Sequence, residues 1–175
     1  MNCDDDYTKY ILRRYKGCSL KHLGQEVQTE TICKILLKRN PWDLVHVLNQ
    51  TEETCKEVVT RNGLILQHVM YQTPEICTLA VIQNGLALQY VKEQTALLNT
   101  LAVRNNGLAL QYAVIQSPDM QRLAVMQNPL AIQYVDEQTA YLCKIAIKGS
   151  YKSYQWIKKP SSGIKKMFHA LYKMQ

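Results

Sequence analysis

The chain has 175 residues, of which 47% are hydrophobic and 20% charged, a composition typical of a soluble folded protein. This length suffices to bury a core without disulfides or metals, and no run reaches the roughly eighteen apolar residues that a membrane-spanning helix needs. The net charge of +7 is concentrated at one end, because residues 138–175 contain eight lysines and no acidic residue, whereas residues 1–137 carry thirteen basic and fourteen acidic residues.

The sequence begins with Met-Asn-Cys-Asp-Asp-Asp, which is acidic where a secretory signal would be basic and then apolar. We therefore expect an intracellular protein in a reducing compartment. Asp4 to Asp6 could cap an amphipathic helix over about residues 7–16, and Gly17 and Gly24 interrupt a degenerate first unit. Residues 1–28 are predicted to form N-terminal capping helices.

A repeat of 22 residues follows. An asparagine recurs at this spacing, each time followed by Gly or Pro, at Asn40, Asn62, Asn84, Asn106 and Asn128. Halfway between these lies a second series, a glutamine followed by Thr or Ser, at Gln28, Gln50, Gln72, Gln94, Gln116 and Gln138. The unit therefore consists of two eleven-residue segments, each opening with a residue that can cap a helix. Residues 29–159 are predicted to form the repeat body.

The segment led by Thr or Ser predicts an α-helix. Pro74 and Pro118 directly follow the cap, at the first helical position, where proline costs little. Apolar residues then fall at positions +3, +4, +6, +7 and +8, which form one broad face of a helix with 3.6 residues per turn. Position +7 is a small residue that would let neighbouring helices approach closely: Ala80, Ala102, Ala124 and Ala146.

The segment led by Asn is also predicted to be helical. Its second residue is Gly63, Gly85 or Gly107 in some repeats and Pro41 or Pro129 in others. Because proline fixes φ near −65°, this position cannot require a positive φ. The prediction is an all-α, right-handed solenoid of about six 22-residue helix-turn-helix repeats with capping helices. A β-solenoid is the alternative, since Leu-Ala-Leu-Gln-Tyr-Val is rich in strand formers.

The last part of the chain differs from the repeats. A break at Lys158-Lys159-Pro160 is followed by an amphipathic pattern through Met167, Phe168 and Leu171. Residues 160–175 are therefore predicted to form a basic C-terminal helix that closes the repeat body.

Two stretches carry a resemblance to a known family. Asn-Gly-Leu-Ala-Leu-Gln-Tyr at residues 84–90 and 106–112, with Ala-Val-x-Gln-Asn at 80–84 and 124–128, resembles a short repeat with the signature Asn-Gly-x-Ala-Leu-x-Tyr. That family occurs in giant viruses and some amoeba-associated bacteria. The resemblance covers roughly residues 40–148 and weakens at Trp42 and at His68. It implies helical repeats and a viral or amoebal setting, in host cytoplasm or virion, but no catalytic residues, because the family has no assigned activity.

No catalytic or metal site is predicted. Four cysteines occupy one phase of the repeat, Cys33, Cys55, Cys77 and Cys143. Stacked helices would hold them roughly 8–10 Å apart, beyond the ~7 Å Cα separation that a disulfide tolerates, and no zinc-ligand spacing accompanies them. We interpret them as buried thiols, and the four scattered histidines as structural. We therefore expect a non-enzymatic protein without a cofactor.

Repeat proteins commonly bind partners through one face, and two features are candidates for such a surface. Two rows recur every 22 residues, formed by Gln89, Gln111 and Gln133 and by Tyr90, Tyr112 and Tyr134. Their strict periodicity favours packing, with the glutamines satisfying turn carbonyls of the next repeat. Val114, Ile115 and Met126 are instead apolar where most sister repeats are polar, which indicates a protein-contact patch. We expect a scaffold for protein–protein interaction, and end repeats could also stack into a homo-oligomer.

The lysine-rich end supports an alternative function. Lysines interleaved with aromatic residues could bind single-stranded nucleic acid by phosphate contact and base stacking, or an anionic membrane surface. The residues concerned are Lys152, Trp156, Lys158, Lys159, Lys165, Lys166 and Lys173. A solvated end cap is the plainer interpretation, and the absence of arginine from residues 138–175 argues against base-specific recognition.

Overall fold

The computed structural model describes residues 3–14 and 16–172. Every regular element in this part of the chain is a helix, and none of its residues forms a strand. The all-α prediction is therefore confirmed, and the β-solenoid alternative is wrong.

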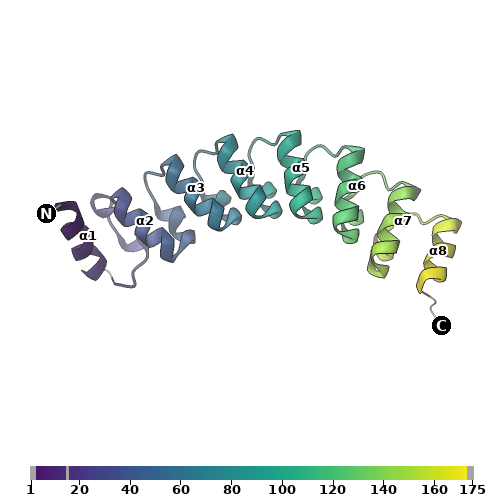
Figure 1. Ribbon diagram of the computed structural model, residues 1–175, viewed down its shortest axis with the longest axis horizontal. Coiled ribbons are helices and arrows are strands. Elements are labelled where there is room, and N and C mark those ends of the chain that lie inside the picture. Colours follow the sequence, from purple (N-terminus) through teal and green to yellow (C-terminus); the bar gives the residue numbers. More distant parts are fainter. Residues whose placement is uncertain (1–2, 15, 173–175) are drawn as a thin grey trace. The chain divides into compact units, whose positions relative to one another are not determined.

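The chain divides into two compact units, residues 1–83 and 84–175. The first unit holds α1 (Cys3–Arg14), η1 (Leu20–His22), η2 (Gln25–Val27), α2 (Glu30–Arg39), η3 (Pro41–His46), α3 (Glu52–Arg61), η4 (Gly63–His68) and α4 (Pro74–Gln83). The second holds η5 (Gly85–Tyr90), α5 (Ala96–Asn105), η6 (Gly107–Tyr112), α6 (Pro118–Gln127), η7 (Pro129–Tyr134), α7 (Ala140–Gly149), η8 (Tyr151–Trp156) and α8 (Ser162–Tyr172). Within each unit, each α-helix packs against the next along the chain (Figure 1).

The α-helices begin as predicted. The side-chain oxygens of Thr29, Thr51, Thr95, Ser117 and Thr139 each accept from the N–H three residues later. Four of the five positions of the predicted face are buried: in α4, for example, positions +3, +4, +7 and +8 are Ile76, Cys77, Ala80 and Val81, whereas Leu79 at position +6 is half-buried. The first helix differs from its prediction, because α1 begins at Cys3 and residues 4–6 therefore lie in its first turn instead of preceding it.

The Asn-led segment forms a six-residue 3₁₀ helix, shorter and more tightly wound than the predicted helix. In η5, Asn84 Oδ1 accepts from Leu86 N–H at 3.0 Å, and Asn84 O accepts from Ala87 N–H at 2.8 Å. The first bond reaches the residue two positions later and the second reaches the residue three positions later. The segment therefore begins with the three residues per turn of a 3₁₀ helix. Leu88 and Val91 are buried together. An interval of three residues keeps Leu88 and Val91 on one face in an α-helix and in a 3₁₀ helix. The apolar pattern therefore could not distinguish these two types of helix.

Glycine is the second residue of this segment because two backbones approach closely there. A Cβ at Gly107 would lie 2.5 Å from the carbonyl oxygen of Ala124, at the end of the next α-helix. The Gly107 N–H donates to Gln127 Oε1 at 2.6 Å. The same arrangement joins Gly63 to Gln83 and Gly85 to Asn105. Of the described glycines, Gly17 alone has a positive φ, so the expectation that this column needs none is confirmed.

Where this column holds proline, the residue it faces also changes. Proline has no N–H to donate, and the residue that faces Pro129 is Gly149, where a Cβ would overlap the proline ring. Arg61 has the same repeat position relative to Pro41 as Gly149 has to Pro129, and its guanidinium donates to the carbonyl oxygens of Leu37 and Lys38. Glycine at this column is therefore matched with an amide side chain, whereas proline is matched with glycine in one case and with arginine in the other.

A second set of contacts comes from the glutamine that precedes each helix cap. Gln138 Nε2 donates to Ile132 O in its own repeat at 2.9 Å and to Trp156 O in the next at 3.0 Å, while its Oε1 accepts from Lys158 N–H at 2.9 Å. Gln50 and Gln94 make the same three bonds in their repeats. One side chain therefore satisfies three backbone groups and fastens consecutive repeats.

Candidate functional site

The rows of glutamine and tyrosine are engaged locally. Gln89, Gln111 and Gln133 donate from Nε2 to carbonyl oxygens three residues earlier, at 3.0, 3.1 and 3.0 Å. The carbonyls lie in each glutamine's own segment, not in the next repeat, so that detail of the packing interpretation is wrong. The matching tyrosines, Tyr90, Tyr112 and Tyr134, are half-buried.

The apolar candidates lie in the second unit. Val114 and Ile115, in the turn after η6, are 79% and 75% exposed, and Met126 on α6 is also exposed. Val114 and Ile115 border a hollow of about 410 Å³, whereas Met126 is not among the residues that line it. We call this hollow the Val114 groove. The residues that line it are Val91, Lys92, Gln94, Ala96, Asn99, Thr100, Val114, Ile115, Ser117 and Met120.

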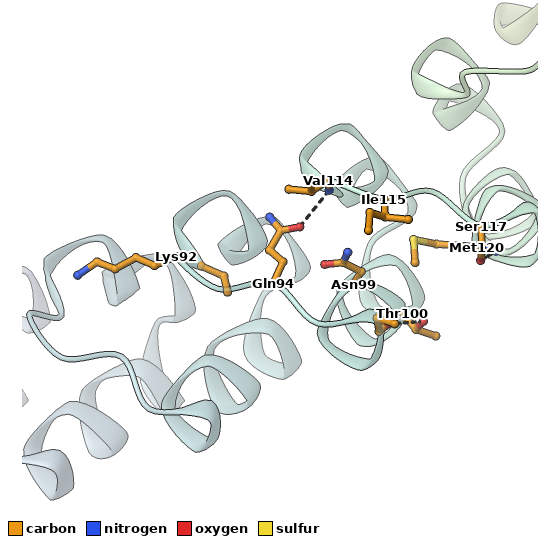
Figure 2. Close-up of a pocket in the computed structure, with 10 residues that line it drawn as sticks. Lys92, Gln94, Asn99, Thr100, Val114, Ile115, Ser117 and Met120 are labelled. Carbon is orange, nitrogen blue, oxygen red and sulfur yellow. Dashed lines mark hydrogen bonds between the residues drawn. The ribbon is translucent and has the colours of Figure 1, made fainter.

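Small side chains, Ala96 and Thr100, line the α5 wall of the groove. In α2 and α3 the position equivalent to Thr100 is a lysine, and Lys34 and Lys56 extend along their helices to pair with Glu30 and Glu52 at 2.9 and 3.1 Å. The shorter Thr100 instead donates its hydroxyl to Ala96 O at 2.8 Å. The opposite wall is held by Gln94, whose Oε1 accepts from Val114 N–H at 3.1 Å (Figure 2).

Asn99 is the polar group that the predicted sites omitted. Its side chain lines the groove and is only 3% exposed. Among the residues that the structure describes, Asn99 Oδ1 is the one buried side-chain oxygen or nitrogen without a hydrogen-bond partner. Such an atom carries a desolvation cost with no compensating bond. Figure 2 shows Asn99 between Gln94 and Thr100.

The sequence did contain a signal for Asn99. It occupies the column of buried cysteines, and three other members of that column direct a donor at the glutamine of their own repeat. Cys55 Sγ and Cys77 Sγ each lie 3.7 Å from the Oε1 of that glutamine, and Gln121 Nε2 donates to Gln116 Oε1 at 3.3 Å. Asparagine is shorter than glutamine and, unlike cysteine, carries a carbonyl. Asn99 and Gln121 are the two polar residues in a column that otherwise holds cysteine, and this exchange marks the site.

At the other end of the second unit, the aromatic residues pack on one another. Tyr154 stacks on Phe168 with ring centroids 4.0 Å apart, and Tyr172 donates its hydroxyl to Ile147 O. Lys152, Lys158, Lys159, Lys165 and Lys166 are exposed, as is Trp156, whereas Lys173 lies outside the described residues. The lysines are therefore placed to meet phosphate, but the rings of Tyr154 and Phe168 are engaged in packing and are not free to stack on bases.

The cysteines at the predicted phase are buried thiols. Burial raises the pKa of Cys55 from 9.0 to about 11, and it also raises the pKa of Cys33 and of Cys143. A raised pKa keeps the thiol protonated and unreactive.

Alkylation should therefore discriminate between the cysteines. At pH 8, iodoacetamide should modify Cys55 about a hundredfold more slowly than the partly exposed Cys18, as measured by peptide mass spectrometry. Equal alkylation rates in the native protein would contradict the buried placement.

The same raised pKa predicts how stability depends on pH. The folded state keeps the Cys55 proton while the unfolded state loses it, so the free energy of unfolding should fall as the pH rises from 9.0 towards 11.

Comparisons with protein-family models, with curated proteins and with solved structures found no match to this chain. In the part of the chain that the structure describes, no helix has the length and hydropathy needed to cross a bilayer. The same residues include no group of three or more His, Cys, Asp and Glu side chains that could hold a metal ion.

Proposed function

We propose that this protein is a non-enzymatic scaffold that binds another protein, and that the Val114 groove is its contact site. The proposed framework is an α-solenoid of about six 22-residue repeats with capping helices at both ends. The three pairs of a glycine with an amide side chain, and the glutamines that bond to two consecutive repeats, support it, because they join one repeat to the next at recurring positions.

One observation carries the proposal. Val114 and Ile115 expose more than two thirds of their surface beside a hollow of about 410 Å³. Adjacent exposed aliphatic side chains next to a concave, mostly apolar wall are typical of interaction sites. Neighbouring repeats in the second unit carry Lys92 and Glu93 or Asp136 and Glu137 at the same two positions, so repeat packing does not require apolar residues there.

The exposed lysines favour a second candidate function, association with nucleic acid. Lys158, Lys159, Lys165 and Lys166 present positive charge within a region that has no acidic residue. Binding of this kind rests on phosphate contacts and weakens steeply as salt rises, whereas an apolar interface does not.

The test is capture of the full-length tagged protein's partner from its native cell lysate, with and without nuclease. Val114→Lys/Ile115→Glu should lower recovery of a discrete, nuclease-resistant protein about tenfold without lowering the melting temperature. The matched control is Leu97→Lys/Tyr141→Glu, which removes two exposed apolar residues of the same unit outside the groove and should leave recovery unchanged.

A second arm uses Lys165→Glu/Lys166→Glu. Protein recovery that is insensitive to this change supports the scaffold. Recovery of nuclease-sensitive material alone, lost in the lysine variant and unaffected by Val114→Lys/Ile115→Glu, would instead place the function at the basic end.

A further inference from the structure

We propose that the Val114 groove receives an extended segment of the partner protein, which inserts one aliphatic side chain and donates a main-chain N–H to Asn99 Oδ1. This inference rests on the proposed scaffold function and specifies the chemistry of the partner. Three observations lead to it: the apolar walls, the single unsatisfied acceptor, and the exposed rim.

The walls call for an aliphatic group. Met120 is buried on α6, Ala96 begins α5, and Val114 and Ile115 flank the opening. A methionine with three rotatable bonds adapts to the shape of an inserted side chain. An aliphatic group placed among these residues would remove apolar surface from water on both sides, whereas a cationic group would lose its hydration and meet the like charge of Lys92, which also lines the groove.

The polar atoms of the groove call for a single donor. The other polar side chains are already engaged: Gln94 accepts from Val114 N–H, the Thr100 hydroxyl donates to Ala96 O, and Ser117 Oγ accepts from Met120 N–H. Among the described residues, Asn99 Oδ1 is the buried acceptor that has no donor. This oxygen has almost no accessible surface, so the side-chain amide must rotate towards the groove to accept a bond from an occupant. An occupant that brings an N–H beside its aliphatic group would complete the hydrogen bonding of the groove.

The rim favours a peptide over a compact small molecule. The hollow of about 410 Å³ is at the small end of ligand pockets. Val114 and Ile115, which are 79% and 75% exposed, project beside it, and a molecule confined to the hollow would leave most of their surface in water. A chain that continues past the inserted residue would cover the rim as well, and its backbone has an N–H next to every side chain.

The test uses a defined probe, the capped tripeptide acetyl-Ala-Leu-Ala-N-methylamide, titrated into the full-length protein. Methyl NMR signals of Val114, Ile115 and Met120 report on the groove. They should shift together and saturate with a Kd of roughly a millimolar, which is reasonable for so small a ligand. Acetyl-Ala-Lys-Ala-N-methylamide should leave them in place. Absence of saturating shifts with the leucine probe would overturn the inference.

Two changes isolate the hydrogen bond. Asn99→Cys restores the residue found at this position in α3 and α4, and should keep or raise the melting temperature because it removes the unsatisfied oxygen. It should also weaken probe binding about tenfold. An ester analogue of the probe that lacks the leucine N–H should lose a similar factor against the wild type and little against Asn99→Cys. Equal binding of both probes to the wild type would overturn the role of Asn99.

The same variant separates the inference from the proposed function. If partner capture falls with Val114→Lys/Ile115→Glu but is unchanged in Asn99→Cys, the scaffold proposal stands and the hydrogen-bonded peptide is wrong. If capture is indifferent to Val114→Lys/Ile115→Glu, the scaffold proposal fails at this groove. If sedimentation shows that the free protein self-associates through Val114 and Ile115, the occupant is a second copy of the chain, and the peptide inference is also wrong.

Discussion

Replacing Gly149 by glutamine should destabilise the protein by about 2 to 4 kcal/mol, and replacing Pro129 by glycine in the same chain should restore most of that loss. The single change forces a Cβ into the ring of Pro129, which cannot move aside as a flexible side chain would. In the double variant, the glycine introduced at position 129 has an N–H that can donate to the new amide side chain at position 149. Gly107 N–H donates to Gln127 Oε1 in the same way, at 2.6 Å. Urea unfolding of the wild type and the three variants measures the coupling.

Gly163 provides the matched control. It also lies in a helix, and no described atom would come within 4 Å of its Cβ. Gly163→Gln should therefore change the free energy of unfolding by less than about 1 kcal/mol, since only helix propensity is altered. Additive effects of Gly149→Gln and Pro129→Gly, with no rescue in the double variant, would show that the two residues are not a matched pair.

The second large effect is expected at Gln138. Its replacement by alanine removes three hydrogen bonds to backbone groups of two consecutive repeats. Each backbone group left without a hydrogen-bond partner lowers the free energy of unfolding. Water reduces this loss, because Gln138 is only half-buried. We expect a loss of about 2 to 3 kcal/mol in the free energy of unfolding.

Gln133→Ala is the comparison for Gln138→Ala. Gln133 makes one hydrogen bond, to Leu130 O within its own segment, at 3.0 Å. Its replacement should cost less than about 1 kcal/mol. The urea midpoints of the two variants decide the matter: a Gln133→Ala loss as large as that of Gln138→Ala would contradict the division between fastening and local glutamines.

The spacing of a few residues was enough to predict much of the helical structure. Thr and Ser caps recurring every 22 residues, with an apolar face beyond them, correctly predicted α2 to α7. The exchange of Gly and Pro correctly excluded a positive φ. Local chemistry decides these features, because a cap and an amphipathic face act within a few residues of each other.

Features that depend on contacts between repeats were harder to predict. The Asn-led segment forms a 3₁₀ helix whether its second position is Gly85, Pro129 or Tyr151, and in each case the side chain of the preceding cap accepts from the N–H two residues later. Neither fact appears in the apolar pattern. The fastening role of Gln94 was missed because a glutamine before a helix cap also occurs as an ordinary exposed residue.

The Val114 groove was also predicted only in part from the sequence. Val114 and Ile115 were selected from the sequence because they differ from their sister repeats, and the structure places both beside the hollow. Met126 was selected by the same criterion and lies elsewhere. Asn99 was not selected, because burial of its oxygen without a partner depends on the lengths of the side chains around it.

Photo-crosslinking from position 114 shows directly whether the Val114 groove binds a protein. A benzophenone amino acid would replace Val114 in the full-length protein, and the lysate of its native cells would be treated with nuclease before irradiation. One discrete crosslinked protein is expected, and it should be absent when the same amino acid replaces Leu97 on the exposed part of α5. Crosslinks from both positions to the same mixture of proteins, or none from position 114, would contradict this expectation.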